Sequence, residues 1–530
     1  MSVAADVGSS AFPNIGTAAL PRLDDRQVGA INHIRNLSRL PPNDWSHMMG
    51  RAPMQEDYSA YRYQLAYMYY ASALAYKHRL PAAPGLFKDT SNRLIEKMLL
   101  PEVWLYWRNA SQGKGPFTLD LPALGVETNP VIRDNIMYSG YLQTMALMHH
   151  LLFDDARYAQ PGSLTFEFRP FLSILDQSAD YTYDEKSLNE RIYWNMVENG
   201  YLGVACEPGC VFQICNQIPI LGFRLHDVLY GGEIAREVTE GYLAAWSDFG
   251  GVIGPDGHYT TLVVTSNRTP IPGSYSGPWS DAWCGMLMNM WNGEAVKANY
   301  ERLRDAWIVD GPSGTKSVRL PPAPEGAGAL PEGSTADLGW MSAWASEMGD
   351  RETLDGLLAH ADRFMKPRWL DGGYYYPRCD TSRDSFGNLT IMDPTTGNAL
   401  LNYARLNVPN GLRKLYENPR GALALKEPVI TGISNDAALR CAMFLPDSNA
   451  LVFTPTAGCE EADTSIFRIE NIADRGAWSL SIDGQTVATG DERTCQATGP
   501  VPVRVENGAI SIEAPLSSEP NIVVAWRQQH

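Results

Sequence analysis

The chain has 530 residues, of which 44% are hydrophobic and 19% charged, and this balance is typical of an ordered globular protein with more than one domain. A formal net charge of −17 argues against a nucleic-acid partner, which needs a basic face, and disfavours docking on anionic membranes. No apolar run reaches the roughly 18 residues of a membrane span. The N-terminus lacks the basic start and the continuous apolar region of a secretory signal. We therefore expect a cytoplasmic protein with reduced thiols, no nucleic-acid partner and no membrane span.

Helical patterning covers most of the chain. Residues 1–24 carry no periodic pattern and are expected to form an N-terminal arm. A first helix is predicted to start near Asp24, and the strongest pattern, YSAYRYQLAYMYYASALAYKHRL at 58–80, is apolar almost all round, which predicts a helix buried on most sides. Further helices are predicted at 91–110, 133–153, 186–199, 216–229, 231–248, 281–291, 294–305, 335–348, 351–366 and 397–415.

The connecting segments indicate how these helices are organised. Gly-rich turns followed by aromatic residues or Pro recur after several helices, which favours helix pairs with functional loops at one end of an (α/α) toroid. The Pro/Gly-rich segment 310–334 is predicted to be a surface loop. After about residue 420, short runs of Val, Ile, Phe and Thr alternate with Gly, Asn and Asp turns, as in a β-sandwich-like module. We predict an arm at 1–24, a helical domain at 25–418 and a β-rich module at 419–530.

Three of the eight cysteines, Cys206, Cys210 and Cys215, lie within ten residues of one another. With His226 they could form a zinc site, but their C-x3-C and C-x4-C spacing is not a familiar one. A disulfide is unexpected in a reducing compartment, and buried packing is the plainest alternative. Because Glu207 and the amides of CNQIP accompany the thiols in a Gly/Pro-containing loop, we favour a role in chemistry.

Other residue pairs accompany this loop at regular spacings. Cys215 follows Cys206 by nine residues, Phe212 follows it by six, and the remaining pairs are Asp57 with Tyr63, Met137 with Tyr141, and Tyr275 with Trp279. Taken together over about residues 25–415, these motifs resemble the linalool dehydratase/isomerase domain family. The resemblance implies an (α/α)6 barrel, a homo-oligomer that is a pentamer in the founding member, and a cofactor-free enzyme without a metal site. Such an enzyme dehydrates a tertiary allylic terpene alcohol or isomerises it to a primary one.

The resemblance also assigns roles to individual residues. It implies a catalytic set of Asp57, Tyr63, Cys206, Glu207 and Cys215, and a substrate-binding set of Met137, Tyr141, Phe212, Tyr275 and Trp279. One position differs, because Tyr141 stands where the family pattern has a catalytic His. Asp57 also precedes a predicted helix and is a natural N-cap.

These residue types suit the removal of water from an allylic alcohol. A thiol has a reference pKa near 8.5 and is mostly protonated at neutral pH, so it can protonate a departing hydroxyl. A thiolate or a carboxylate can accept the proton lost from carbon. Aromatic faces stabilise a developing cation by roughly 0.5–2 kcal/mol each, and an apolar pocket excludes the water that would quench it.

Two other functions remain open at this stage. A proton-initiated terpenoid cyclase would use the same acid on an alkene or epoxide. A carbohydrate-active toroid enzyme would instead use a pair of carboxylic acids in an open groove, and the thiols would have no role. No phosphate-binding loop, dinucleotide fingerprint or HExxH motif is present in the sequence.

Overall fold

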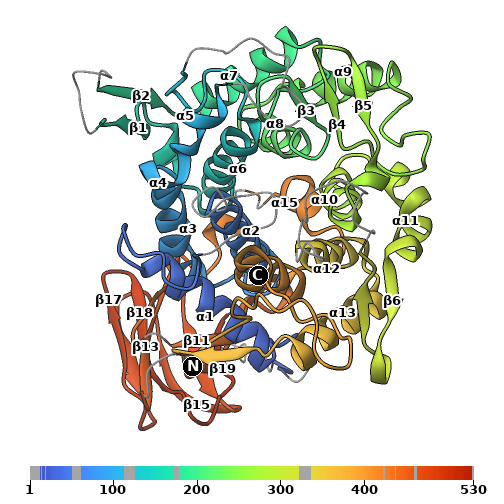
Figure 1. The fold of residues 1–530 in the computed structure, drawn as a ribbon. Helices are drawn as coiled ribbons and strands as arrows, with labels where there is room; N and C mark the ends of the chain where they lie inside the picture. Colours follow the sequence, from blue (N-terminus) through green and yellow to red (C-terminus); the bar gives the residue numbers. More distant parts are fainter. Residues whose placement is uncertain are drawn as a thin grey trace, which may run out of the picture.

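The computed structural model describes residues 12, 15–17, 19–49, 61–112, 126–170, 178–320, 336–419, 421, 424–435, 437–458 and 462–527. Helices form the body of the molecule and strands dominate from Val429 onward (Figure 1), so the prediction of a mainly helical protein with a C-terminal β module is confirmed. No helix in the described ranges is long and apolar enough to cross a lipid bilayer.

Six helices contact one another in a closed ring. Each packs against the next along the chain, and the last packs against the first. In order they are α2 (Tyr61–His78), α6 (Ile136–Phe153), α8 (Gln217–Tyr230), α10 (Pro278–Met288), α12 (Ala336–Met348) and α14 (Leu401–Leu406).

A second set of helices covers this ring from outside. Each outer helix precedes one inner helix in the chain and packs on the ring, several of them across two of its helices. They are α1 (Asp25–Arg39), α3 (Pro84–Met98), α7 (Glu185–Glu198), α9 (Ile234–Ser247), α11 (Gly293–Trp307) and α13 (Arg351–Phe364).

The residue patterns explain why the two sets differ. In α2 every residue from Tyr61 to Tyr76 is buried, as expected of a helix with protein on all sides. In α11 the buried residues are Val296, Tyr300, Leu303 and Trp307, a single stripe at helical spacing. The first kind of helix belongs inside the ring and the second kind outside it.

Two predicted helices are wrong in extent. The segment 91–110 is divided among three helices. The helix α3 begins upstream at Pro84 and ends at Met98, before Pro101. The helix α4 (Pro101–Trp104) begins at that proline, and α5 (Tyr106–Ala110) follows. The segment 397–415 is divided as well: a π-helical turn at Thr396–Leu400 leads into α14, and α15 (Gly411–Glu417) begins beyond Pro409.

Short antiparallel strand pairs between the helices were not predicted. They are β1 (Leu164–Phe168) with β2 (Ala179–Tyr183), β3 (Cys210–Phe212) with β4 (Leu262–Val264) and β5 (Thr269–Ile271), β6 (Ile308–Asp310) with β7 (Lys316–Val318), and β8 (Arg368–Leu370) with β9 (Gly373–Tyr375). The β6–β7 pair occupies part of the predicted loop 310–334, of which residues 321–335 lie outside the described part of the chain. Most of the predicted arm 1–24 also lies outside it.

The C-terminal module consists of two antiparallel sheets. One has the order β10 (Val429–Ile433), β13 (Thr464–Glu470), β18 (Ala509–Pro515) and β17 (Val503–Glu506). The other has the order β11 (Ala438–Leu445), β12 (Ala450–Thr456), β19 (Ile522–Trp526), β14 (Trp478–Ile482), β15 (Gln485–Gly490) and β16 (Cys495–Ala497). The rings of Phe453 and Phe467, one from each sheet, lie 5.3 Å apart, so the sheets face each other across an apolar core.

The module is joined to the outer helices by backbone contacts. Ile430 N donates to Ala82 O at 2.7 Å, and Ala82 N donates to Ala442 O at 3.2 Å. At the start of α3, Gly85 lies so close to β10 that a Cβ there would be 2.3 Å from Thr431 O. The close approach therefore requires glycine at this position.

We predict that Gly85→Ala lowers the thermal unfolding temperature, at a cost of about 1–3 kcal/mol, because the added methyl group collides with the backbone of β10. Alanine is intrinsically the better helix former, so propensity alone would give the opposite sign. The measurement is differential scanning calorimetry, with Gly421→Ala as control because its Cβ would meet no atom within 4 Å. An unchanged or raised unfolding temperature in Gly85→Ala would contradict the prediction.

Candidate active site

The loop that carries the cysteines is fixed by one buried amide. The Asn216 side chain donates to Val204 O at 3.0 Å and to Phe212 O at 2.8 Å, and its oxygen accepts from Val204 N at 2.8 Å. Within the loop, Cys206 N donates to Cys210 O at 2.9 Å. These bonds fold the segment back on itself, and Cys206 and Cys215 come to lie against each other.

The two thiols form a hydrogen-bonded pair in the interior. Cys206 is 4% exposed and Cys215 is fully buried. The hydrogen bond to Cys215 and burial raise the pKa of Cys206 well above its usual value. Burial also raises the pKa of Cys215, but the bond from Cys206 opposes that rise. Both thiols therefore hold their protons at neutral pH, and Cys206 holds its proton more strongly.

Glu207 adds a carboxyl group to the pair. Burial raises the pKa of Glu207, while the charge of Arg62 and a hydrogen bond from Cys206 partly oppose the rise. A carboxylate with a raised pKa is a stronger base than a solvated one. The cluster thus contains two proton donors and one base.

Arg62 is a site residue that the sequence analysis missed. It is 1% exposed, and its guanidinium carbon lies 4.3 Å from the ring centre of Tyr63 and 4.1 Å from that of Tyr106. Its Nη2 donates to the Tyr63 hydroxyl at 2.8 Å. Burial lowers the pKa of Arg62, but the acidic groups around it, Tyr106 and Tyr63 first and then Cys206 and Glu207, raise it above its usual value. A signal was present, because Arg62 is the only charged residue between Tyr58 and Tyr76.

Tyrosines of α2 and α6 form one wall of the site. Tyr63 donates a short hydrogen bond to Met137 Sδ. Tyr141 is fully buried, and its ring centre lies 6.1 Å from that of Tyr63 and 5.7 Å from that of Tyr67. Tyr67, one turn after Tyr63, was also missed. The structure therefore brings Tyr63, Met137 and Tyr141 together.

Tryptophans of α10 and α12 form the facing wall. Trp283 stacks on Trp340 with ring centres 4.0 Å apart, and it lies edge-on to Tyr63 at 5.5 Å. Trp279, one turn earlier, is buried at 6.4 Å from Trp283. The i, i+4 repeat of tryptophan on α10 is the sequence signal that points to Trp283.

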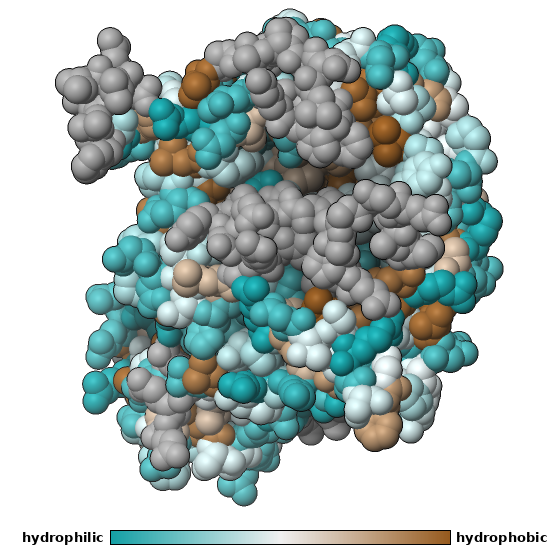
Figure 2. Space-filling view, viewed as in Figure 1, coloured by the Kyte–Doolittle hydropathy of each residue, from teal (hydrophilic) through white to brown (hydrophobic). Residues whose placement is uncertain are grey.

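The other predicted residues lie elsewhere. Phe212 is half-buried at the end of β3. Tyr275 is 74% exposed on a short turn before α10 and is not part of the buried cluster. Asp57 lies outside the described residues. On the face seen in Figure 2, hydrophilic residues dominate the described surface and hydrophobic residues are scattered among them. The aromatic side chains of the cluster are buried.

The zinc and disulfide alternatives find no support among the described residues. Within those ranges no group of three or more His, Cys, Asp or Glu side chains is arranged to hold a metal ion. Cys206, Cys210 and Cys215 are all free thiols.

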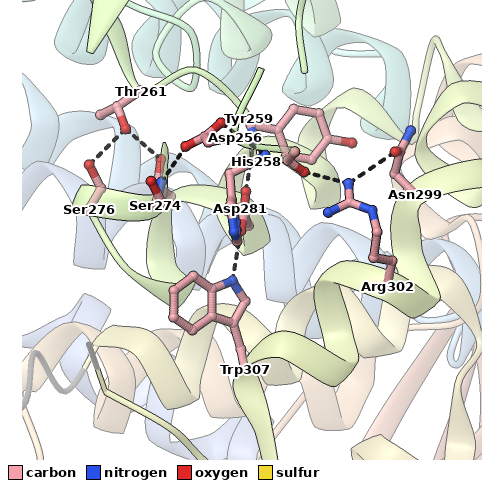
Figure 3. A network of polar contacts seen from close by, with 12 residues as sticks. Asp256, His258, Tyr259, Thr261, Ser274, Ser276, Asp281, Asn299, Arg302 and Trp307 are labelled. Atoms are coloured by element: carbon pink, nitrogen blue, oxygen red, sulfur yellow. Dashed lines mark hydrogen bonds and ion pairs between the residues drawn. The ribbon is translucent and has the colours of Figure 1, made fainter. Parts of the chain in front are cut away.

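A polar network ties the loop before α10 to the ring (Figure 3). The fully buried Asp281 of α10 accepts from His258 Nδ1 at 2.6 Å, from Trp307 Nε1 at 2.7 Å and from Tyr259 N at 2.9 Å. The bond to Asp281 raises the pKa of His258. The network fixes the segment that leads into β4, the strand paired with the cysteine loop.

We predict that this network makes stability depend on pH. Because the folded-state pKa of His258 is raised, its ion pair stabilises the protein fully below about pH 6.5, and that contribution is lost as pH rises through the folded-state pKa. The loss should be below about 1 kcal/mol, the range of a partly exposed ion pair. Unfolding measured between about pH 5.5 and pH 9 should show the decline in the wild type and a flatter profile in His258→Asn.

His78→Asn is the matched control. Burial lowers the pKa of His78 to about 4, so this side chain is neutral in the folded protein over the whole range tested. Its own contribution arises in the unfolded state and ends near pH 7, so above that pH the profile of His78→Asn should run parallel to that of the wild type. Parallel pH profiles for the wild type and His258→Asn would refute the prediction.

Comparison with known proteins identifies a family for this chain. Among solved structures, a variant of the alpha-1,6-mannanase of Salegentibacter sp. HEL1_6 in complex with alpha-1,6-mannotriose has 11% identity and a TM-score of 0.40, covering 74% of this chain and 100% of the mannanase. The unsaturated glucuronyl hydrolase of Streptococcus agalactiae has 10% identity and a TM-score of 0.39, with 74% and 93% covered. That of Bacillus sp. GL1 has 11% identity and a TM-score of 0.40, with 74% and 97% covered. These scores are too low to support an inference about this chain.

The family model for linalool dehydratase/isomerase matches residues 62–382, more than half of the sequence, and the chain therefore belongs to the linalool dehydratase/isomerase family.

Proposed function

We propose that the protein is a cofactor-independent lyase or isomerase that acts on an isoprenoid alcohol through the thiols of Cys206 and Cys215. The observation that carries this proposal is the hydrogen-bonded thiol pair, buried beside Glu207 and within electrostatic reach of Tyr63 and Tyr67. Family membership supports the reaction class. We also propose that the ring of helices is an (α/α)6 barrel spanning residues 25–418, followed by the β module at 419–530.

The proton that leaves with the hydroxyl comes from Cys206 in this mechanism. Cys206 protonates the hydroxyl oxygen, the C–O bond breaks, and water departs with both bonding electrons. The remaining allylic cation is spread over three carbons. Cys206 suits this role because it keeps its proton until a strongly basic oxygen takes it.

The carboxylate of Glu207 removes the second proton. Loss of a proton from the carbon beside the cation gives a diene. Addition of water to the far allylic carbon, with loss of a proton, instead gives the isomeric alcohol. The hydrogen bond between Cys206 and Glu207 then returns the proton to Cys206 and restores the starting state. The family resemblance places Asp57 as a further base.

The surroundings suit a short-lived cation. The faces of Tyr63, Tyr141 and Trp283 are available to stabilise positive charge, and burial excludes water. The positive charge of Arg62 nearby would oppose the cation, so Glu207 must be ionised when the cation forms. Arg62 favours that ionisation, because it lowers the pKa of Glu207 against the effect of burial.

A polysaccharide-cleaving activity fits this cluster less well. Glycoside hydrolysis needs two carboxyl groups flanking the bond that breaks. Within the described ranges, Glu207 is the carboxylate for which contact with the thiol pair is found. A terpenoid cyclase would use the same acid and is distinguished by its products.

The test is turnover of a panel of C5 to C20 prenyl alcohols, including linalool, with products analysed by gas chromatography–mass spectrometry. We expect dehydrated or isomerised products from the wild type without added metal or cofactor. In Cys206→Ser and Cys215→Ser, kcat should fall by about 10²-fold or more, because a serine hydroxyl is a much weaker acid than a thiol.

Cys284→Ser is the matched control, because the buried Cys284 thiol donates to Gln213 Oε1 at 2.9 Å and a serine hydroxyl can do the same. Its activity should match the wild type. Full activity in both Cys206→Ser and Cys215→Ser would disprove the thiol mechanism. Ring-closed products of unchanged mass would identify a cyclase instead.

A further inference from the structure

The hydroxyl group of Tyr67 occupies an unusual position in the aromatic cluster. The residue lies at the centre of α2 and is fully buried. Trp283 Nε1 donates to its oxygen at 2.7 Å, and the Tyr141 hydroxyl donates to the same oxygen at 3.4 Å. The oxygen therefore accepts two hydrogen bonds, one from α10 and one from α6.

The hydroxyl hydrogen of Tyr67 is left without an acceptor in the described part of the chain, where the oxygen acts only as acceptor. A buried donor without an acceptor costs about 1–3 kcal/mol, so a group of this kind is retained where something accepts its hydrogen bond during function. Two other tyrosines of α2 differ in this respect. Tyr63 donates to Met137 Sδ, and Tyr70 shares a hydrogen bond of 2.5 Å with Thr144.

Tyr67 also lies near one of the thiols. Ionisation of Cys215 would raise the pKa of the Tyr67 hydroxyl, which places the two groups within electrostatic reach. Donation from Trp283 and Tyr141 withdraws electron density from the phenol oxygen, and chains of hydrogen bonds strengthen one another. Tyr67 is thus a polarised donor near Cys215, the partner of the proposed acid.

We propose that Tyr67 binds the alcohol oxygen of the substrate by donating a hydrogen bond to it, and that Trp283 and Tyr141 fix Tyr67 for this purpose. This inference rests on the proposed function and names the group that recognises the substrate's hydroxyl. No proton is transferred from Tyr67: its hydrogen bond holds the oxygen in place while Cys206 protonates it and the C–O bond breaks.

The role of Tyr141 follows from the same geometry. This residue stands where the family pattern has a histidine, and its hydroxyl reaches Tyr67. Tyr141 is therefore a positioning residue that acts through Tyr67.

The first test is a binding measurement that does not depend on turnover. The probe is linalool with its vinyl group reduced, which keeps the tertiary alcohol but cannot form an allylic cation, and the comparison ligand is the hydrocarbon of the same skeleton. By isothermal calorimetry, Tyr67→Phe should bind the alcohol about 10-fold to 100-fold more weakly than the wild type, with affinity for the hydrocarbon unchanged. Tyr70→Phe, which removes a hydroxyl from another buried tyrosine of α2, should leave both affinities unchanged.

The second test uses Trp283→Phe, which keeps an aromatic ring but removes the N–H that donates to Tyr67. Its affinity for the alcohol should fall by a smaller factor than in Tyr67→Phe, and by a larger factor than its affinity for the hydrocarbon, which loses only the contact with the larger ring. This variant keeps the inference testable if Tyr67→Phe does not fold, which thermal unfolding would reveal.

Two outcomes would overturn the inference alone. One is an affinity of Tyr67→Phe for the alcohol equal to that of the wild type. The other is an equal loss of affinity for the alcohol and for the hydrocarbon, which would make Tyr67 a packing residue. In both cases the wild type would still turn over prenyl alcohols and Cys206→Ser would not. If the wild type neither binds the reduced alcohol nor converts any prenyl alcohol, the proposed function fails and this inference fails with it.

Discussion

The site depends on one hydrogen bond, between the thiols of Cys206 and Cys215 in the interior of a helical ring. A thiol in water is poised to ionise slightly above neutral pH. Burial and mutual contact raise the pKa of both thiols, so the pair is held in the protonated form. A base is present at the same point because Glu207 follows Cys206 directly. Acid and base are thus supplied by one loop, and the rest of the fold serves to enclose it.

The enclosure follows from the architecture. Each inner helix contributes side chains to the middle of the ring, so residues far apart in sequence meet there: Arg62 and Tyr63 from α2, Tyr141 from α6, and Trp283 and Trp340 from α10 and α12. The aromatic rings provide an apolar surface with negative faces. The buried guanidinium of Arg62 lowers the pKa of Glu207 against the effect of burial. A buried charge is costly unless other groups compensate it, so this arrangement is expected at a site of function.

The sequence predicted the parts of this arrangement that local pattern encodes. The apolar segment around Tyr67 was identified as a buried helix, and the association of Cys206, Glu207 and Cys215 was visible because they are close in sequence. The β module was found from its strand and turn residues. The helix boundaries near Pro101 and Pro409 were missed. The strand pairs whose strands have only three residues were also missed, because such strands are too short to show an alternating pattern.

Contacts across the ring could not be predicted, because no local pattern specifies which faces meet. Trp340 reaches the site only because α12 packs on α10. Tyr67 was one of many tyrosines in the sequence, and its distinction lies in the donors that surround it. Tyr275 was singled out by its spacing to Trp279, yet its side chain is exposed, because the turn before α10 directs it outward.

The central claim is that Cys206 and Cys215 are both protonated at neutral pH because they are buried and bonded to each other. It is tested most directly by infrared titration of the S–H stretching band, with the two thiols identified by subtracting the spectra of Cys206→Ser and Cys215→Ser. The account predicts that the absorption of both thiols persists above about pH 8.5, where an ordinary thiol ionises. Loss of either band at or below neutral pH would show a thiolate in the resting site and would contradict the account.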